Sequence, residues 1–390
     1  MTIDLLAIDG GTALCSSWPS WPPPLDADQR ALVDDVLGSG LWGAAQGGLC
    51  ERFSEDFAAR HAAAHAVAVG NGTLALFVAL RALGIGPGDE VIVPVYTFVA
   101  CATAVLLAGA TPVLTDVSAS HLHLTAETIQ EAMSPRTRAI MVVHLAGSPA
   151  PMAEILDVAR TAGIAVIEDA AQAHGAAYDG RPVGALGDVS TFSFQSSKAM
   201  TAGEGGLIVT DNAELAARAW SIANVGRTRG GEWYGHQTIG WNLRMTEIQA
   251  AILIPWIGRL DEEIARRNEF ADALAGELGE TPIQVVAPPE GTTIDSRHLL
   301  MLRLAKGMSR DWVARALAAE GLPVDLGYPG LHRIEPVAMK SRRIRTPRFD
   351  AVADRIIWLR QPVLMSGADG AHAAAAALHR VVTDRRARGA

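Results

Sequence analysis

A lysine stands among small polar residues, between an apolar segment and a glycine-rich turn. Residues 191–206 read TFSFQSSKAMTAGEGG, with the lysine at position 198. A lysine that forms a Schiff base needs a partly desolvated amine, because desolvation lowers its pKa and makes the neutral nucleophile accessible. Ser193, Ser196 and Ser197 offer hydroxyl groups to a phosphate, and the glycines allow a close approach of the backbone. Taken alone, the spacing of Lys198 fits a solvated lysine in a Ser/Gly loop equally well.

An acidic residue closes another apolar segment. Asp169 ends the run AVIED, and Gln172 follows three residues later. A carboxylate at the end of a buried strand is costly without a cationic partner, and ligands bind just outside such strand ends in α/β sheets. Asp169 is therefore either a partner for a protonated pyridine nitrogen or an ordinary helix N-cap.

Two further strand ends carry residues suited to a flat, phosphorylated cofactor. Residues 70–73 read GNGT and lead from an apolar run into a helical pattern. Free N–H groups at a helix start favour phosphate, although a capped turn has the same appearance. Tyr96 and Phe98 follow the next apolar run, and either ring is able to stack on a cofactor or to pack in the core. The glycines form no GxGxxG motif and no GxxxxGK[ST] motif is present, which weakens the case for nucleotide binding.

These residues need a sheet whose strands end at one edge. Apolar runs alternate with helix-length segments from residue 65 onward, which predicts an α/β fold with a largely parallel sheet and helices on both faces. The short gap 195–205 predicts a reversal of chain direction. The predicted strands are 66–69, 90–93, 111–114, 139–143, 165–167, 189–194 and 206–209, and the helices between the earlier ones are 73–83, 97–107, 125–133 and 152–162.

The chain divides into three predicted parts. Residues 1–25 form an extended arm, since prolines between 18 and 24 prevent a helix, and Asp26 caps the helix that follows. Residues 26–265 form a large domain, and residues 266–390 form a smaller α/β domain. A long helix over 246–278, with a kink at Pro255, connects the two.

Composition excludes several classes of protein. A chain of 390 residues that is 49% hydrophobic is able to build a large core. Its net charge of −9 argues against general nucleic-acid binding. No apolar run reaches the ~18 residues that span a membrane, and the N-terminus lacks a signal-peptide pattern. Three scattered cysteines form neither a disulfide framework nor a zinc site, so we expect a cytoplasmic protein without a bound metal.

The order of these features resembles the fold-type I pyridoxal-phosphate aminotransferases of the DegT/DnrJ/StrS family. The resemblance runs from about Trp18 to the C-terminus and is most specific from FSF at 192–194 through Lys198 to EGG at 204–206. It implies a large cofactor domain with a mostly parallel sheet and a smaller C-terminal α/β domain. It also implies that Lys198 forms the Schiff base and moves the proton, that Asp169 pairs with the pyridine nitrogen, and that pyridoxamine 5'-phosphate is an intermediate.

Other positions match the family pattern in the same way. Gln172 matches the residue near the 3-hydroxyl of the ring, and Phe98 matches the stacking aromatic. Asn242 matches an asparagine that reaches the phosphate of the neighbouring subunit's cofactor, so the resemblance implies a homodimer with shared active sites. The matching phosphate contacts within one chain are Gly72, Thr73 and Ser193.

Short segments narrow the resemblance to the glutamine-dependent cyclitol aminotransferases and the aminohydroxybenzoate synthases. They are WPSWP at 18–22, Gln195, YPGL at 328–331 and WLRQPVL at 358–364. The resemblance implies L-glutamine or L-glutamate as amino donor and a small polyhydroxylated ketone, such as scyllo-inosose, as acceptor, in the biosynthesis of aminoglycoside-like antibiotics. An aromatising synthase remains an alternative.

Four residues bear on the substrate. Ala146 stands where many nucleotide-sugar enzymes have tyrosine, which weakens the alternative of a nucleotide-sugar aminotransferase without excluding it. Tyr328 is a candidate substrate contact. Arg227 and Arg229 are candidates to bind the donor carboxylate or a substrate from across a dimer, and a solvated loop is the slightly favoured alternative for each.

Three other interpretations account for fewer of these residues. The related sugar dehydratases carry histidine where Lys198 stands, so the lysine argues against that activity. A non-catalytic sensor would not need Lys198, Asp169 and Ser193 together. The sequence IDGGT at residues 8–12 resembles a sugar-kinase phosphate loop, but that loop requires a following β-hairpin and prolines come instead.

Overall fold

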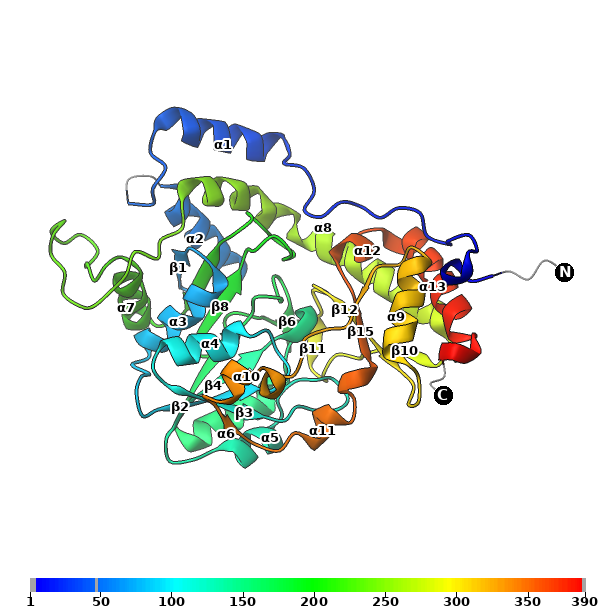
Figure 1. The fold of residues 1–390 in the computed structure, drawn as a ribbon. Coiled ribbons are helices and arrows are strands. Elements are labelled where there is room, and N and C mark those ends of the chain that lie inside the picture. Colours follow the sequence, from blue (N-terminus) through cyan, green and yellow to red (C-terminus); the bar gives the residue numbers. More distant parts are fainter. Residues whose placement is uncertain (1–4, 46–47, 388–390) are drawn as a thin grey trace.

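The computed structural model describes residues 5–45 and 48–387, so the first four residues of the predicted arm lie outside it. A central sheet of eight strands has the order β1-β9-β8-β5-β4-β2-β3-β14 (Figure 1). Strand β9 is antiparallel to both of its neighbours, and the other adjacent pairs are parallel. The predicted parallel sheet and the reversal after β8 are confirmed. The strands are β1 (His65–Val69), β2 (Glu90–Pro94), β3 (Thr111–Thr115), β4 (Thr137–Val143), β5 (Ala165–Asp169), β8 (Val189–Ser193), β9 (Gly206–Thr210) and β14 (Arg342–Arg343).

Helices pack against this sheet and against one another. Every residue of β2, β8 and β9 is buried. The central residues of β2 and β9 therefore form continuous apolar runs rather than alternating patterns, whereas β8 has serine or threonine at three of its five positions. Helix α4 begins at Ala100, three residues later than predicted, and this leaves Thr97 and Phe98 in a loop at the strand end. The helices are α2 (Leu49–Arg60), α3 (Gly72–Ala82), α4 (Ala100–Leu107), α5 (Ala126–Ala132), α6 (Met152–Ala162) and α7 (Ala213–Ala223).

A long helix joins the central sheet to a second, antiparallel sheet. Helix α8 (Glu247–Leu278) begins with a capping box between Thr246 and Gln249 and continues through Pro255. The second sheet has the order β10-β12-β15-β13 and encloses its own hydrophobic core with α9 (Arg310–Ala319) and α13 (Gly367–Val382). The predicted domain boundary at 265/266 falls inside α8, and β14 returns to the central sheet; the division into domains stays a prediction. The strands are β10 (Ile283–Val285), β12 (Leu300–Leu304), β13 (Val324–Asp325) and β15 (Ile356–Leu359).

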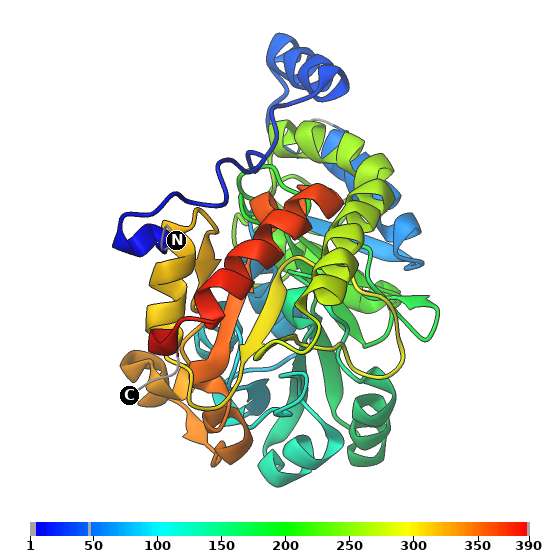
Figure 2. The ribbon, with the colours of Figure 1, turned by 90° about the vertical axis from the view of Figure 1, so that its right-hand side faces the viewer.

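The N-terminal arm crosses the molecule to reach the cavity described below (Figures 1 and 2). It packs Leu6 and Cys15 into the second core, and Trp18 Nε1 donates to the carbonyl of Gly321 at 2.7 Å. Asp26 then caps α1 (Ala27–Ser39), as predicted. Residues 7–9 form a short 3-10 turn and no strand or hairpin follows in the described arm, so the sugar-kinase alternative is wrong. None of the helices in the described ranges is both long and apolar enough to cross a membrane.

Candidate active site

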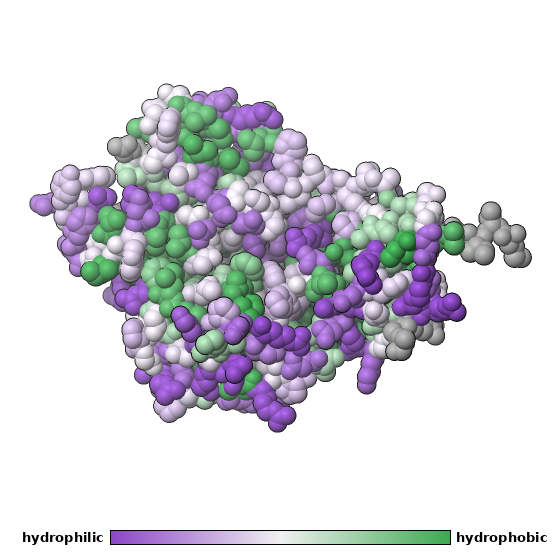
Figure 3. All heavy atoms as spheres, viewed as in Figure 1, coloured by the Kyte–Doolittle hydropathy of each residue, from purple (hydrophilic) through white to green (hydrophobic). Residues whose placement is uncertain are grey.

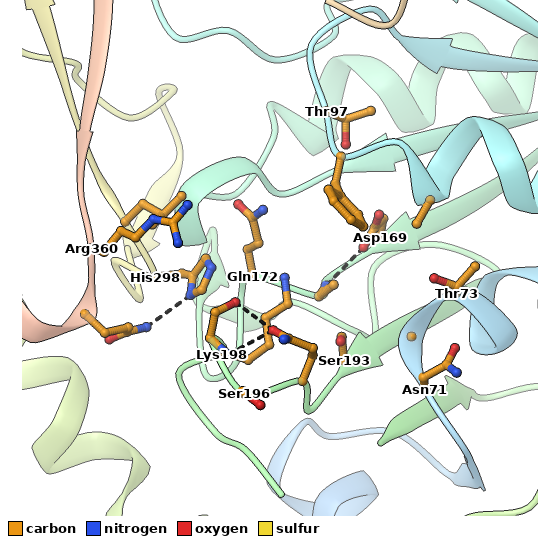
Figure 4. Close-up of a pocket in the computed structure, with 18 of the residues that line it drawn as sticks. Asn71, Thr73, Thr97, Asp169, Gln172, Ser193, Ser196, Lys198, His298 and Arg360 are labelled. Carbon is orange, nitrogen blue, oxygen red and sulfur yellow. Dashed lines mark hydrogen bonds between the residues drawn. The ribbon is translucent and has the colours of Figure 1, made fainter. Parts of the chain in front are cut away.

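A cavity of about 860 Å³ lies where the carboxyl ends of several strands of the central sheet meet the second sheet (Figure 4). It brings together segments that are far apart in the sequence and collects most of the predicted site residues. Three of the predicted residues, Asn242, Arg227 and Arg229, do not line it. Its walls include Trp21, Gly72, Thr73, Phe98, Asp169, Gln172, Ser193, Lys198, His298, Tyr328 and Arg360.

One end of the cavity is a cradle at the start of α3. Asn71 caps this helix, because its Oδ1 accepts a hydrogen bond from the N–H of Leu74 at 2.9 Å. The N–H groups of Gly72 and Thr73 have no hydrogen-bond partner among the described residues. A Cβ at position 72 would come within 2.6 Å of Ser193 Cβ, so only glycine leaves this space open. Free N–H groups, the helix dipole and the Ser193 hydroxyl together suit a phosphate.

Asp169 lies at the end of β5 and points toward the cavity. Its Oδ2 accepts a hydrogen bond from Cys101 Sγ at 2.9 Å, and its Oδ1 accepts one from the N–H of Ala171 at 3.1 Å. The chain continues from Asp169 into turns and not into a helix, so the alternative of a helix N-cap is wrong. The carboxylate is held at two oxygens and remains available to a cationic group.

Lys198 extends into the same cavity from the loop after β8. Desolvation lowers the pKa of its amine, although the charge of Asp169 acts in the opposite direction. Because Lys198 lines the cavity and is only partly exposed, a solvated lysine in a loop is the wrong interpretation. Two of the three neighbouring serines stabilise the loop itself, since Ser196 Oγ donates to the carbonyl of Gly203 and Ser197 Oγ to Gln195 Oε1. Ser193 is the serine that remains for a ligand.

The loop of Lys198 is also held from the N-terminal arm. Trp21 Nε1 donates to the carbonyl of Lys198 at 3.1 Å, and its ring packs against Trp256 with 5.7 Å between the ring centroids. The sequence marked Trp21 as part of a motif but not as a site residue. Its position depends on the path of the whole arm.

Gln172 and Tyr328 form one wall. Gln172 Oε1 accepts from the N–H of Ala146 at 2.6 Å, and its Nε2 donates to the Tyr328 hydroxyl at 3.0 Å. Burial raises the pKa of Tyr328, so the phenol stays protonated at neutral pH. The ring of Phe98, which is half exposed, lies 5.6 Å from the ring of Tyr328. These side chains bound a flat space beside Asp169 and Lys198.

A chain of hydrogen bonds fixes the proton on His298. Arg267 is fully buried, and its Nε donates to Gln361 Oε1 at 2.7 Å. This contact orients the amide so that Gln361 Nε2 donates to His298 Nδ1 at 3.0 Å. Burial also holds the pKa of His298 well below its usual range. His298 is therefore neutral, with its proton on Nε2.

Sequence reasoning missed Cys101, His298 and Arg360. His298 lies two residues before β12 and Arg360 directly follows β15, so each lies at a strand end, as Asp169 does at the end of β5. That signal was present in the sequence. Nothing in it showed that the ends of these strands face Lys198.

The three predicted residues outside the cavity lie in or near the loop between α7 and α8. Arg227 Nε donates to the carbonyl of Trp233 at 2.7 Å, and its guanidinium lies over the ring of the same residue. Arg229 forms an ion pair with Glu51 at 2.8 Å. Asn242 is exposed. Within this chain, none of the three faces Lys198.

Comparison with known proteins places this architecture among aminotransferases. The chain is 37% identical over 374 residues to 3-amino-5-hydroxybenzoate synthase of Amycolatopsis mediterranei, covering 92% of this chain and 95% of that protein. It is 41% identical over 314 residues to L-glutamine:scyllo-inosose aminotransferase of Streptomyces griseus, covering 77% and 74%. The crystal structure of a 3-amino-5-hydroxybenzoic acid synthase superimposes with a TM-score of 0.89 at 34% identity, over 94% of this chain and 98% of that one.

The cavity fits pyridoxal phosphate, the cofactor of such enzymes. It offers a lysine of lowered pKa, a fixed carboxylate and a cradle that a Cβ at position 72 would fill. The model of the DegT/DnrJ/EryC1/StrS aminotransferase family matches residues 23–377. The chain therefore belongs to this family of pyridoxal-phosphate-dependent aminotransferases.

Proposed function

We propose that this aminotransferase moves an amino group from L-glutamine or L-glutamate to a small, neutral, polyhydroxylated ketone of the keto-cyclitol class, in the biosynthesis of an aminoglycoside-like antibiotic. The observation that carries the chemistry is that Lys198 and Asp169 face one cavity, beside the cradle at Gly72. The donor and acceptor follow from the relatives named above. The cavity volume of about 860 Å³ lies within the range of small-molecule sites.

Each site residue has a proposed task. When bound, pyridoxal phosphate supplies an electron sink that lets the Cα–H bond of an amino donor break. Lys198 would hold the cofactor covalently and carry that proton on its Nζ, which its lowered pKa favours. Asp169 would keep the ring nitrogen protonated. Phe98 would stack on the ring, Gln172 would lie near its 3-hydroxyl, and Gly72, Thr73 and Ser193 would hold its phosphate.

We also propose a cytoplasmic homodimer that shares its active sites. Large apolar side chains are exposed at the end of α1 and in the loop between α7 and α8, which projects at the left of Figure 1. Figure 3 shows hydrophobic residues over α1 and toward this loop. A second copy that covered them would bring Asn242 toward a neighbouring site. The exposed residues are Leu37, Leu41, Trp42, Trp233, Tyr234, Ile239 and Trp241.

A second candidate function is that of an aromatising synthase. The similarity to 3-amino-5-hydroxybenzoate synthases, in sequence and in structure, supports it. Both functions need the same lysine and the same carboxylate. The acceptor separates them, because the synthase reaction yields an aromatic amine and the cyclitol reaction does not.

The decisive experiment combines a spectrum with a product analysis. The purified protein should show the visible absorbance of lysine-bound pyridoxal phosphate, and L-glutamine should bleach it. Lys198→Ala should abolish turnover, whereas Lys340→Ala, at an exposed lysine, should retain it. Full turnover by the Lys198 variant would end the proposal. Mass spectrometry after incubation with a panel of keto-cyclitols and keto-sugars identifies the acceptor and tests for an aromatic amine.

A further inference from the structure

Arg360 stands at the end of the cavity that lies away from the phosphate cradle. It follows β15 directly and lines the cavity together with Lys198. In Figure 4, Arg360 and His298 lie on one side of Lys198, and Asn71 and Thr73 lie on the other. A cofactor with its phosphate in the cradle would leave the side of Arg360 to the substrates.

We infer that the Arg360 guanidinium binds the α-carboxylate of the amino donor, with the Nε2–H of His298 as a second donor beside it. This inference rests on the proposed function, because it names a recognition element for the donor half of the reaction.

The charges of the cavity support this role. Among the residues that the structure describes, the charged ones that line it are two acids, Asp169 and Glu204, and two bases, Lys198 and Arg360. Lys198 is assigned to the cofactor, which leaves Arg360 as the cation for a substrate. L-glutamine and L-glutamate carry an α-carboxylate that needs a cationic partner when it leaves water. A keto-cyclitol carries no charge and therefore needs no cationic partner.

The guanidinium retains capacity for a ligand. Its side chain is 57% exposed. Within the described residues it makes one hydrogen bond, from Nη2 to Asp325 Oδ2, which is also an ion pair and leaves its other N–H groups for a ligand. Arginine has five N–H donors in a planar fork that matches a carboxylate. The positive charge of Arg360 also acts on His298 and Tyr328, both of which line the cavity, so its field reaches the substrate space.

The other candidate arginines are worse placed in this chain. Arg227 lies over Trp233, and Arg229 is paired with Glu51, both away from the cavity. Arg267 is fully buried behind Gln361 and does not line the cavity. Position therefore favours Arg360.

The first test is a binding measurement on the holoenzyme that does not depend on turnover. The probe is glutaramate, which is glutamine without its amino group and therefore does not react. Arg360→Gln should weaken glutaramate binding about ten- to hundredfold in calorimetry, the loss expected when charged hydrogen bonds are removed. Arg52→Gln is the matched control, since Arg52 is similarly exposed with one acidic partner, Asp56, outside the cavity. Equal affinity of wild type and Arg360→Gln would overturn the inference.

The second test asks whether the effect belongs to the carboxylate. The donor half-reaction is followed by the absorbance of the cofactor. In it, Arg360→Gln should lower the rate with L-glutamine about ten- to hundredfold at low glutamine concentration. It should not change the rate with 4-aminobutanamide, which is glutamine without its α-carboxylate. The assignment of Arg360 would be overturned if Arg360→Gln lowered the rates with both amines equally. It would also be overturned if the substitution lowered only the rate of the ketone half-reaction. If wild type does not respond to any amino donor, the proposed function itself fails.

Discussion

The thiol of Cys101 donates a hydrogen bond to Oδ2 of Asp169 at 2.9 Å, deep beneath the cavity. Cys101 is fully buried, and its sulfur also lies 3.2 Å from Thr97 Oγ1. Burial and the neighbouring carboxylate hold the pKa of Cys101 well above its usual range, so the thiol keeps the proton that it donates. Cys101 is thus a positioning residue for the carboxylate proposed to meet the cofactor ring.

Replacement of Cys101 tests this relationship. Cys101→Ala removes the donor and should raise the dissociation constant of pyridoxal phosphate about three- to thirtyfold, since one hydrogen bond to a charged group is lost. Cys101→Ser retains a donor and should stay within about threefold of wild type. The measurement is a titration of cofactor-free protein with pyridoxal phosphate. If Cys101→Ala bound pyridoxal phosphate as tightly as wild type, the hydrogen bond from Cys101 would not be needed to position Asp169.

The contact between Trp21 and Lys198 predicts a local effect of the N-terminal arm. Trp21→Phe retains a ring but loses the hydrogen bond to the Lys198 carbonyl. This loss should lower the free energy of unfolding by about 1 kcal/mol. We expect a measurable change in the visible absorbance of the bound cofactor and a few-fold rise in its dissociation constant.

Trp18→Phe is the matched control for that experiment. It loses the same kind of hydrogen bond, from an indole of the same arm, but to Gly321 in the second sheet region. Its stability in urea should fall by a similar amount, about 1 kcal/mol, while the cofactor spectrum stays unchanged. Identical spectral changes in both variants would contradict a specific role for Trp21.

The close approach of Gly72 to Ser193 predicts that the cradle does not tolerate a side chain. The Cβ of Gly72→Ala would lie 2.6 Å from Ser193 Cβ and 3.0 Å from its Oγ. Overpacking of this kind costs about 1–3 kcal/mol, and the displaced N–H and hydroxyl groups should weaken cofactor binding at least tenfold. Thermal unfolding and the cofactor titration measure the two effects.

Gly276→Ala provides the comparison for Gly72. Gly276 lies inside α8, and no atom outside its own helical turn lies within 4 Å of the place that a Cβ would take. Alanine there should stabilise the protein by about 0.5–1 kcal/mol, because it is a better helix former, and should leave cofactor affinity unaltered. If Gly72→Ala, like Gly276→Ala, stabilised the protein and left cofactor affinity unaltered, the phosphate cradle at Gly72 would be refuted.

Glu168, which precedes Asp169, predicts a pH-dependent loss of stability. Burial by itself raises the pKa of this carboxyl, but hydrogen bonds from His144, Gly187 and Ser190 outweigh it and hold the pKa at about 2, against 4.5 for a free side chain. Because the folded pKa is the lower one, the stabilisation is complete above pH 4.5 and is lost as the pH falls toward 2. This difference in pKa corresponds to about 3 kcal/mol of the free energy of unfolding at neutral pH.

Urea unfolding at several pH values tests this directly. Glu168→Gln cannot titrate, so its stability deficit relative to wild type should be largest at neutral pH and should shrink as the pH falls below 4.5. Glu154→Gln, at an exposed position, should show no such trend. A deficit of Glu168→Gln that is constant with pH would contradict the lowered pKa.

Local sequence determined the strands of the central sheet and many of the residues at their ends. Strands buried on both faces are mostly apolar, so β2, β4 and β5 were predicted from their apolar runs. β8 was predicted as well, although three of its five residues are serine or threonine. Polar residues placed directly after such runs, such as Asp169, reach one edge of the sheet by geometry alone. The glycine-rich loop after β8 marked Lys198 in the same way. Helices α2 and α7, which do not separate successive strands in this pattern, escaped prediction.

Only the tertiary structure decided how the cavity closes. The contact of Cys101 with Asp169 spans 68 residues of sequence, that of Arg267 with Gln361 spans 94, and that of Trp21 with Lys198 spans 177. Such contacts depend on how the two sheets and the arm pack together, which the periodicity within one segment does not encode. For the same reason Ser196 and Ser197 were indistinguishable from Ser193 in sequence, although their hydroxyls bond within the loop. Local sequence thus identified the residues with suitable chemistry, and long-range packing decided which residues contact them.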